Sequence, residues 1–239
     1  MDAKVKTLRG WIAGSDNIVF FGGAGVSTES GIPDFRSVDG LYNQQWDYPP
    51  ETILSDVFFE KNPEEYYRFH HAKLVVDGEE PNRCHLRLAE LEREGKLRAV
   101  VTQNIDGLHQ AAGSKNVLEL HGSTLRAYCT RCHAPYPADE MNHCEGVPHC
   151  HKCGGIVRPD IVLYGEMLDQ DVLTRAVGYI RNADVLIVGG TSLGVYPAAG
   201  LINYYNGSKL ALVNLSDTPY DQYANLVIHE KIGEVFSEV

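Results

Sequence analysis

A glycine-rich turn containing Gly23 and Gly25 is the first feature of this chain that could do chemistry. It follows the apolar run at residues 18–21, which has the composition of a buried strand. Glycine after a strand is typical of phosphate-binding loops in α/β proteins, because it lets the backbone approach a pyrophosphate closely. However, Thr28 stands where the dehydrogenase fingerprint requires Gly or Ala, and no second strand with an acidic end follows. The turn therefore predicts a site for NAD that serves a purpose other than that of an ordinary dehydrogenase.

Three polar side chains follow two other apolar runs. Asn104 and Asp106 come after residues 99–102, and His121 comes after residues 117–120. Ligands of open α/β sheets lie at the carboxyl ends of the strands, so we expect these side chains to converge on one crevice. A histidine suits proton transfer because its unperturbed pKa lies near neutrality. A lone histidine is more often structural, and the residue types alone leave both interpretations of His121 open.

Four cysteines have the spacing of a structural zinc ribbon. Two C-x-x-C turns are separated by residues 133–149, and each turn offers a pair of thiolates. Four thiolates complete a tetrahedron and leave no open position, so we expect a zinc ion that stabilises the fold and takes no part in catalysis. The expected ligands are Cys129, Cys132, Cys150 and Cys153. Other side chains of the segment could compete with them, namely Cys144, His133, His143, His149 and His151.

Blocks along the chain resemble the sirtuin family of NAD-dependent protein-lysine deacylases. They are GAGVSTESGIPDFR at residues 23–36, TQNIDGLH at 102–109, ELHGS at 119–123 and GTSL at 190–193. Their order agrees with the family, as does the position of the cysteine turns between the last two blocks. The resemblance covers roughly residues 5–238, which is nearly the whole chain.

The resemblance implies that an acyl group is removed from lysine at the expense of NAD. The acyl oxygen attacks C1′ of the nicotinamide ribose and nicotinamide leaves. His121, as general base, then lets the 2′ oxygen attack the acyl carbon, and water completes the reaction. The expected products are free lysine, nicotinamide and O-acyl-ADP-ribose. Asn104 is expected to orient a ribose hydroxyl or a water, and Asp106 with the Ile105 backbone to bind the carboxamide of nicotinamide.

The same resemblance assigns the remaining cofactor contacts. Phe35 and Arg36 are expected to steady the diphosphate and to shield the reacting carbon from water. Thr191, Ser192 and Asn214 are expected to hold the adenosine half, although ordinary turn chemistry would also explain them. His121 and Asn104 are the expected catalytic residues. The full expected cofactor-binding set is Gly23, Ala24, Gly25, Thr28, Asp34, Phe35, Arg36, Gln103, Asn104, Ile105, Asp106, His121, Gly190, Thr191, Ser192, Asn214, Leu215 and Ile232.

Residues 161–166 resemble the family's acyl-lysine loop, where an extended peptide adds as a strand between two lobes. Val162 is expected to line the acyl tunnel. Tyr164 departs mildly from the family, which most often has Phe there. The expected substrate-binding residues are Val162, Tyr164, Gly165 and Glu166.

The chain lacks the residues that recognise acidic acyl groups in this family. Sirtuins that prefer succinyl or malonyl lysine carry Tyr-x-x-Arg on the helix before the asparagine-containing segment, and this chain has Phe69 and Ala72 at those places. A buried carboxylate without a cation is costly, so we expect a preference for acetyl or longer apolar acyl groups. His70, His71 and Lys73 lie nearby and weaken this argument.

Composition limits the partners. The net charge of −11 argues against a general nucleic-acid binder, since phosphate contacts need clustered cations. The acidity serves solubility, or alternatively attracts basic polypeptide substrates. The apolar runs are too short to span a membrane, and the N-terminus lacks a signal peptide. We therefore expect acyl-lysine proteins or peptides as partners, no sequence-specific nucleic acid, no membrane, and a cytoplasmic location.

Alternating strand-like and helical runs predict an α/β fold. We expect a Rossmann-like NAD-binding domain at residues 1–124 and 158–239, with a zinc-ribbon module inserted at 125–157. Residues 37–81 should form a cofactor loop and a helical segment, with 37–62 as a flexible cover over the cofactor. The expected strands are 18–21, 99–102, 117–120, 161–163, 185–188 and 210–213, and the expected helices are 5–13, 63–76, 82–94, 170–181, 197–204 and 233–238.

Two other functions remain open from the sequence. A mono-ADP-ribosyltransferase would use the same NAD site and the same leaving group, so only its product would differ. A zinc-ribbon binding module with a degenerate cofactor site is the second alternative, and the intact set of Asn104, Asp106 and His121 argues against it.

Overall fold

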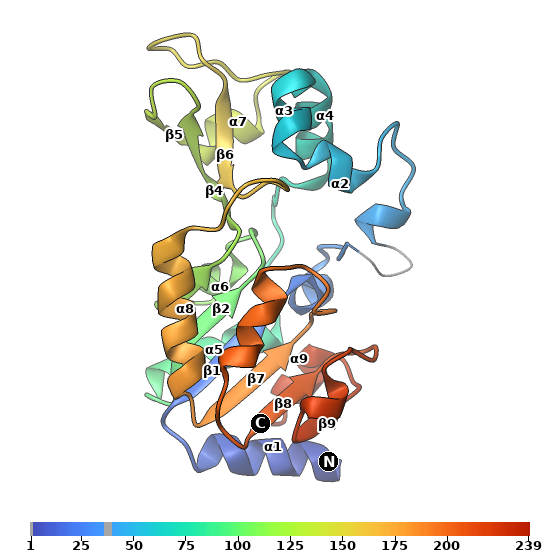
Figure 1. The fold of residues 1–239 in the computed structure, drawn as a ribbon, viewed down its shortest axis with the longest axis vertical. Coiled ribbons are helices and arrows are strands. Elements are labelled where there is room, and N and C mark those ends of the chain that lie inside the picture. Colours follow the sequence, from blue (N-terminus) through green and yellow to red (C-terminus); the bar gives the residue numbers. More distant parts are fainter. Residues whose placement is uncertain (1, 36–39) are drawn as a thin grey trace.

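The structure is a computed structural model that describes residues 2–35 and 40–239. Its larger lobe is built on a six-stranded sheet in which all neighbouring strands run parallel (Figure 1). The strand order is β3 (Val117–Glu119), β2 (Leu97–Thr102), β1 (Ile18–Gly22), β7 (Val185–Gly189), β8 (Leu210–Val213) and β9 (Leu226–Ile228). The expected fold class, a Rossmann-like parallel sheet, is confirmed.

Helices cover both faces of this sheet. One hydrophobic cluster joins the strands to α1 (Ala3–Ala13), α5 (Arg83–Arg93) and α9 (Ile232–Phe236). A second cluster, on the opposite face, joins them to α8 (Gln170–Asn182) and the 3₁₀ helix η4 (Ala198–Tyr204). Since both faces are buried, the central strands are almost continuously apolar, which is why the sequence predicts them well.

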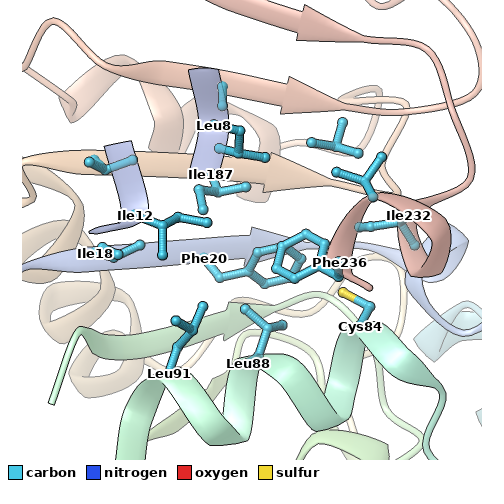
Figure 2. Packing of buried hydrophobic residues seen from close by; sticks show 14 of the residues in the cluster. Leu8, Ile12, Ile18, Phe20, Cys84, Leu88, Leu91, Ile187, Ile232 and Phe236 are labelled. Carbon is cyan, nitrogen blue, oxygen red and sulfur yellow. The ribbon is translucent and has the colours of Figure 1, made fainter. Parts of the chain in front are cut away.

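Aromatic packing anchors the first cluster. The rings of Phe20 in β1 and Phe236 in α9 meet edge to face, with centroids 5.7 Å apart. Figure 2 shows Leu88 and Leu91 of α5 pointing toward Phe20, and all of these side chains belong to the same cluster. Helix α5 begins at Asn82, whose side chain accepts a hydrogen bond from the Cys84 N–H, as expected for an N-cap. The apolar face of α5 therefore fixes β1, and with β1 the turn that follows it.

A smaller lobe sits above the parallel sheet in Figure 1. Its sheet is antiparallel, in the order β5 (Pro135–Pro137), β4 (Gly122–Cys129) and β6 (Val157–Ile161). A third hydrophobic cluster packs it against helices from an earlier part of the chain. The helices of this lobe are α2 (Pro50–Ile53), α3 (Asp56–Lys61), α4 (Pro63–Lys73) and α7 (Ala138–Asn142). The boundaries 125–157 for a separate inserted module stay a prediction.

Of the stretch 37–62, residues 37–39 lie outside the described residues, and its role as a cover over the cofactor stays a prediction. The expectation of an irregular loop is wrong for much of the rest of this stretch. It contains the 3₁₀ helix η3 (Leu41–Asn43) together with α2 and α3. Pro50 occupies the first turn of α2, and the Ser55 side chain caps α3 by accepting from the Phe58 N–H. These helices are too short to show a clear period in the sequence, and burial of Phe58 and Phe59 in the third cluster stabilises them.

Other local expectations also need correction. The expected strand at 161–163 is displaced, because β6 ends at Ile161, where its pairing with Gly122 of β4 ends. The segment 197–204 is mostly a 3₁₀ helix. Strands β4, β5 and β9 and helices α6 (Leu108–Ala111) and α7 were not anticipated. No helix of the described residues is long and apolar enough to cross a bilayer.

Candidate active site

A cleft of about 1110 Å³ lies between the two lobes, above the carboxyl ends of the parallel strands. The strand order reverses between β1 and β7, which is where open α/β sheets bind ligands. Every residue expected to bind cofactor or substrate lines this cleft except Arg36, which lies outside the described residues. The structure therefore brings the expected residues together, while their individual roles stay predictions.

The glycine-rich turn contacts the turn after β7. The Gly25 N–H donates to the Gly190 carbonyl over 2.8 Å, and Gly190 has a φ of +58°. A Cβ at Gly25 would come within 2.9 Å of Gly190 Cα, and one at Gly190 within 2.3 Å of the Val26 nitrogen. Glycine is thus required here so that two backbone segments can touch, in addition to the phosphate contact expected from the sequence.

Ser27 links the two polar residues that follow β2. Its hydroxyl donates to Asp106 Oδ2 over 2.6 Å and accepts from Asn104 Nδ2 over 3.1 Å. Ser27 is 1% exposed, so these bonds form away from bulk water. The sequence analysis missed this residue. Its only signal is a small hydroxyl inside the glycine-rich turn, since its partners lie 77 and 79 positions further along the chain.

Burial changes the acidity of Asp106. Loss of water raises the pKa of this carboxyl above its ordinary value, and the hydrogen bonds from Ser27 and from the Leu108 N–H lower it only in part. Both carboxylate oxygens thereby have fixed partners, Oδ2 with Ser27 and Oδ1 with Leu108. The side chain is held in one orientation at the floor of the cleft.

His121 is held as a neutral imidazole. Its Nδ1 lies 2.9 Å from the carbonyl oxygen of Gln103, which can only accept, so Nδ1 carries the hydrogen. Nε2 is then the nitrogen that can take up a proton. Burial lowers the pKa of His121, and the bond to the Gln103 carbonyl offsets this in part, so the imidazole is uncharged near neutral pH.

Two further contacts hold together the loops after β1, β2 and β7 and the start of α9. Gln103 Nε2 donates to Thr191 Oγ1 over 3.0 Å, which ties the end of β2 to the end of β7. Glu29 Oε1 accepts from the Gly233 N–H at the start of α9 over 2.7 Å. Glu29 was not anticipated, and it connects the glycine-rich turn to the segment that contains Ile232. Removing either contact would loosen one turn relative to the next.

Asn214 shows the turn chemistry that the sequence left open for it. Its Nδ2 donates to the Ser216 carbonyl over 2.8 Å, and its own carbonyl accepts from His229 Nδ1 over 2.9 Å. It nevertheless lines the cleft beside Leu215. Asn214 therefore stabilises the turn after β8, and its contact with a ligand stays a prediction.

The opposite wall of the cleft is the segment after β6. The Tyr164 N–H donates to the Leu54 carbonyl over 2.9 Å, and the Tyr164 carbonyl accepts from the N–H of Asp56, the first residue of α3, over 3.0 Å. The Val162 N–H donates to the carbonyl of His121 over 3.0 Å. The expected substrate segment is thus joined both to the small lobe and to the residue expected to be the base.

The two positions that would recognise an acidic acyl group differ in their surroundings. Ala72 lines the cleft, together with Lys73. Phe69 is fully buried, and its ring meets that of Trp46 edge to face, with centroids 5.0 Å apart. Of the neighbouring histidines, His70 Nε2 bonds the Asn142 side chain and His71 Nε2 the Met141 carbonyl, and neither lines the cleft. Among the described basic residues next to Ala72, Lys73 is therefore the one that lines the cleft.

The four cysteines expected to bind metal converge at one end of the small lobe. Their sulfur atoms all lie within 4.8 Å of one another, with Cys129 and Cys153 3.5 Å apart and Cys132 and Cys150 3.6 Å apart. A zinc tetrahedron with Zn–S bonds of about 2.3 Å has edges of about 3.8 Å, so the set fits this ion. The Tyr136 hydroxyl donates to Cys150 Sγ over 3.1 Å and supports a thiolate there.

None of the described competing side chains of that segment belongs to the cysteine cluster, and three of them have other partners. The Cys144 sulfur bonds the Met141 carbonyl over 3.2 Å and is not part of the cluster. His149 bonds the carbonyl of Gly154, and His151 pairs with Glu140. Among the described residues, the geometry therefore favours the four C-x-x-C sulfurs as the ligand set.

Comparisons with known proteins agree with this geometry. A model of the Sir2 family matches residues 23–197. A curated relative from Clostridium perfringens (strain 13 / Type A), named NAD-dependent protein deacetylase, is 57% identical, and the match covers 100% of this chain and 99% of the relative. A solved Sir2 structure with a p53 peptide and NAD+ is 41% identical, has a TM-score of 0.88, and the match covers 100% and 97% of the two chains. A further Sir2 structure, with a deacetylated p53 peptide and 3′-O-acetyl ADP-ribose, is 40% identical, has a TM-score of 0.91, and the match covers 98% and 96%.

Ser27→Ala should destabilise the protein and make its stability more sensitive to pH. Losing the buried hydroxyl leaves Asp106 and Asn104 without their shared partner, which should lower the free energy of unfolding by about 1–3 kcal/mol. It should also raise the pKa of Asp106 further. Between the pKa of Asp106 in the unfolded state and its higher pKa in the folded state, the folded protein holds a proton that the unfolded chain has lost. Stability therefore falls as pH rises through this range, and in the variant the range should extend to higher pH. Urea unfolding between pH 4 and 8 measures both effects.

The exposed residue Ser216 provides a matched control, because its hydroxyl takes no part in the bonds of Ser27 with Asp106 and Asn104. Ser216→Ala should leave the free energy of unfolding within about 0.5 kcal/mol of the parent. Equal stability of the two variants at every pH would show that the Ser27 hydroxyl does not hold this cluster together.

Proposed function

Because the chain belongs to the Sir2 family, we propose that it uses NAD to remove acetyl groups from lysine side chains of proteins. The observation that carries the proposal is one cleft in which the buried Ser27–Asp106–Asn104 cluster, a neutral His121 and the segment 162–166 face a common space. Relatives named NAD-dependent protein deacetylase, similar over the full chain, support it. So do Sir2 structures that contain NAD+ or an acetylated ADP-ribose.

NAD is the second substrate, and the residues present fit it. The glycine-rich turn at 23–25 and the turn at 190–192 offer backbone groups to the diphosphate and the adenosine half. At the nicotinamide end, the carbonyl of Ile105 already accepts from the Thr124 N–H over 2.9 Å. The Ile105 contact to a carboxamide would therefore come from its N–H, with Asp106 beside it as acceptor.

His121 supplies the base. In the neutral tautomer fixed by the Gln103 carbonyl, Nε2 accepts the proton from a ribose hydroxyl as that oxygen attacks the acyl carbon. The base needs no prior deprotonation at neutral pH, because burial keeps its pKa below the ordinary value. Asn104, held by Ser27, would orient a ribose hydroxyl or a water. The products would be free lysine, nicotinamide and O-acyl-ADP-ribose.

The acyl-lysine peptide would add as a strand along residues 162–165. Among the described residues, the Val162 carbonyl and the Gly165 N–H make no hydrogen bond, whereas both backbone groups of Tyr164 are occupied by the small lobe. An extended peptide could pair with those free groups and pass its acyl-lysine beside Val162 toward His121. Sir2 structures with acetylated and with propionylated peptides support this class of substrate.

The four-cysteine cluster would hold one zinc ion. Cys129, Cys132, Cys150 and Cys153 form a closed set in the small lobe, and none of them lines the cleft. The metal would stabilise the lobe that carries α2, α3 and the substrate segment. Free thiols and a zinc site suit a reducing compartment, which supports a cytoplasmic location.

His121→Ala should abolish deacetylation while preserving the fold. Loss of a general base should reduce kcat/KM by about 10²-fold or more. Nicotinamide exchange should survive in part, since the first displacement does not need the base. In the parent, kcat/KM should fall with decreasing pH only once the pH is below 6.5, the ordinary pKa of histidine, because burial lowers the pKa of His121. Mass spectrometry of an acetyl-lysine peptide across pH 5–9 measures these effects, and O-acyl-ADP-ribose as product separates deacetylation from ADP-ribosyl transfer.

His143 is an exposed histidine outside the cleft and serves as the matched control. His143→Ala should retain the activity of the parent. Parent-like turnover in His121→Ala would show that another group is the base.

Cys150→Ser should lose zinc and stability, because three thiolates and a hydroxyl bind the ion much less tightly. The parent should contain one zinc per chain. Cys144→Ser is the control, since the Cys144 sulfur lies outside the cluster, and it should keep its full zinc content. Elemental analysis and thermal unfolding measure both quantities. Loss of zinc from the Cys144 variant would show that the ligand set is wrong.

The parent should reject succinyl-lysine in favour of acetyl-lysine. A carboxylate left without a cation in the cleft should cost roughly 2–4 kcal/mol, or about 30- to 1,000-fold in kcat/KM. Ala72→Arg should narrow this gap, because Ala72 lines the cleft and arginine offers a bidentate fork to the acid. Phe69→Tyr is the less suitable change, since its hydroxyl would enter a fully buried site.

Ala72→Gln controls for side-chain size without charge, and it should not narrow the gap. Mass spectrometry of matched acetyl and succinyl peptides gives the ratios. Comparable kcat/KM for both peptides in the parent would show that a cation already reaches the acyl group, and Lys73 would be the candidate.

A further inference from the structure

Arg158 and Glu166 form a bidentate ion pair at the base of the substrate segment. Arg158 Nη1 lies 2.6 Å from Glu166 Oε1, and Nη2 lies 3.0 Å from Oε2. The Arg158 side chain is 7% exposed and that of Glu166 is 30% exposed. The guanidinium holds the pKa of Glu166 below its ordinary value, although burial acts in the opposite direction. The negative charge of Glu166 is therefore already balanced by the guanidinium of Arg158.

Aromatic rings fix the guanidinium in place. Its carbon lies 5.2 Å from the centre of the Phe59 ring in α3 and 5.9 Å from that of the Tyr128 ring in β4. Contacts of a cation with ring faces at such distances are attractive, and they are stronger where water is excluded. Arg158 is thereby held by two elements of the small lobe.

The pair also bonds the backbone on both sides of Val162. Arg158 Nη2 donates to the Ile161 carbonyl over 2.7 Å, and Glu166 Oε2 accepts from the Leu163 N–H over 2.8 Å. The chain returns to make the second bond through Gly165, whose φ of +99° favours glycine. The backbone immediately before and after Val162 is thus fastened to one buried ion pair.

We propose that Arg158 and Glu166 are positioning residues that hold residues 161–163 in the extended conformation needed to pair with an acyl-lysine peptide. The inference rests on the proposed function, and it assigns to Glu166 a role different from direct contact with the substrate. Both oxygens of Glu166 already accept hydrogen bonds from Arg158, and Oε2 also accepts from Leu163, so the carboxylate acts on the peptide through the backbone.

Glu166→Gln tests the proposal with little change in size. An amide cannot accept on both atoms, so at least one bond to Arg158 or Leu163 must be lost. We expect KM for an acetyl-lysine peptide to rise about 10- to 100-fold, with kcat and KM for NAD within about 3-fold of the parent. Glu60→Gln in α3 removes an exposed charge outside the cleft and should change none of these values.

Amide hydrogen exchange provides a readout that does not depend on the activity. In Glu166→Gln, the Leu163 amide should exchange at least about 10-fold faster than in the parent, while amides of β1 should be unchanged. If the parent binds no acetyl-lysine peptide, the proposed function fails, whereas the exchange rate of Leu163 still decides whether the pair holds the segment.

A double variant, Arg158→Met with Glu166→Met, covers the case in which breaking the pair unfolds the protein. Removing both charges leaves no buried ion unpaired, so the fold should survive. Peptide KM should rise as in Glu166→Gln, and peptides with basic and with neutral flanking residues should be affected equally. Parent-like peptide KM in the folded double variant, or loss confined to basic peptides, would overturn the proposal.

Discussion

The close approach of the turns after β1 and β7 is the constraint on which the rest of the site depends. Gly25 and Gly190 meet backbone to backbone, and a Cβ at either position would collide with main-chain atoms. This contact lies where the strand order reverses, so it sets the floor of the crevice. Ser27 follows Gly25 by two residues and bonds Asp106 and Asn104. The contact between the two glycines therefore also positions this polar cluster.

Burial then gives the polar side chains their chemical character. The same loss of water raises the pKa of Asp106 and lowers the pKa of His121, because burial disfavours the charged form of each group. That form is the carboxylate of Asp106 and the imidazolium of His121. The neutral imidazole and the fixed carboxyl are therefore consequences of depth in the fold. Ser27 and the Leu108 N–H donate hydrogen bonds to Asp106, and His121 donates one to the Gln103 carbonyl. These bonds partly offset the pKa shifts and fix one orientation for each side chain.

The second lobe supplies the other wall of the cleft. Tyr164 is bonded to Leu54 and to Asp56 at the start of α3, and Arg158 is held by rings of α3 and β4, so residues 161–166 are attached to the small lobe. The cysteine cluster lies in that same lobe. The cysteine cluster and residues 161–163 are thus connected by packing, although the cysteines do not line the cleft.

The sequence by itself determined the parallel core strands, the ligand spacing of the cysteines and a set of polar and glycine residues that all line the cleft where the structure describes them. It could do so because strands buried on both faces are continuously apolar, and because residues at the ends of parallel strands meet at one edge of the sheet. Short or mixed elements such as α2, β4 and β9 were missed, since tertiary packing stabilises them more than any local pattern does.

Only the tertiary structure decided the partners of Ser27, Glu29, Arg158 and Glu166. Each is an ordinary polar residue in the sequence, and three of the four bond groups far along the chain or act through packing against distant rings. The pKa directions of Asp106 and His121 were likewise decided there, because they depend on how much water the assembled lobes exclude. Local sequence carries residue type and spacing, whereas burial and long-range contact exist only once the chain has folded.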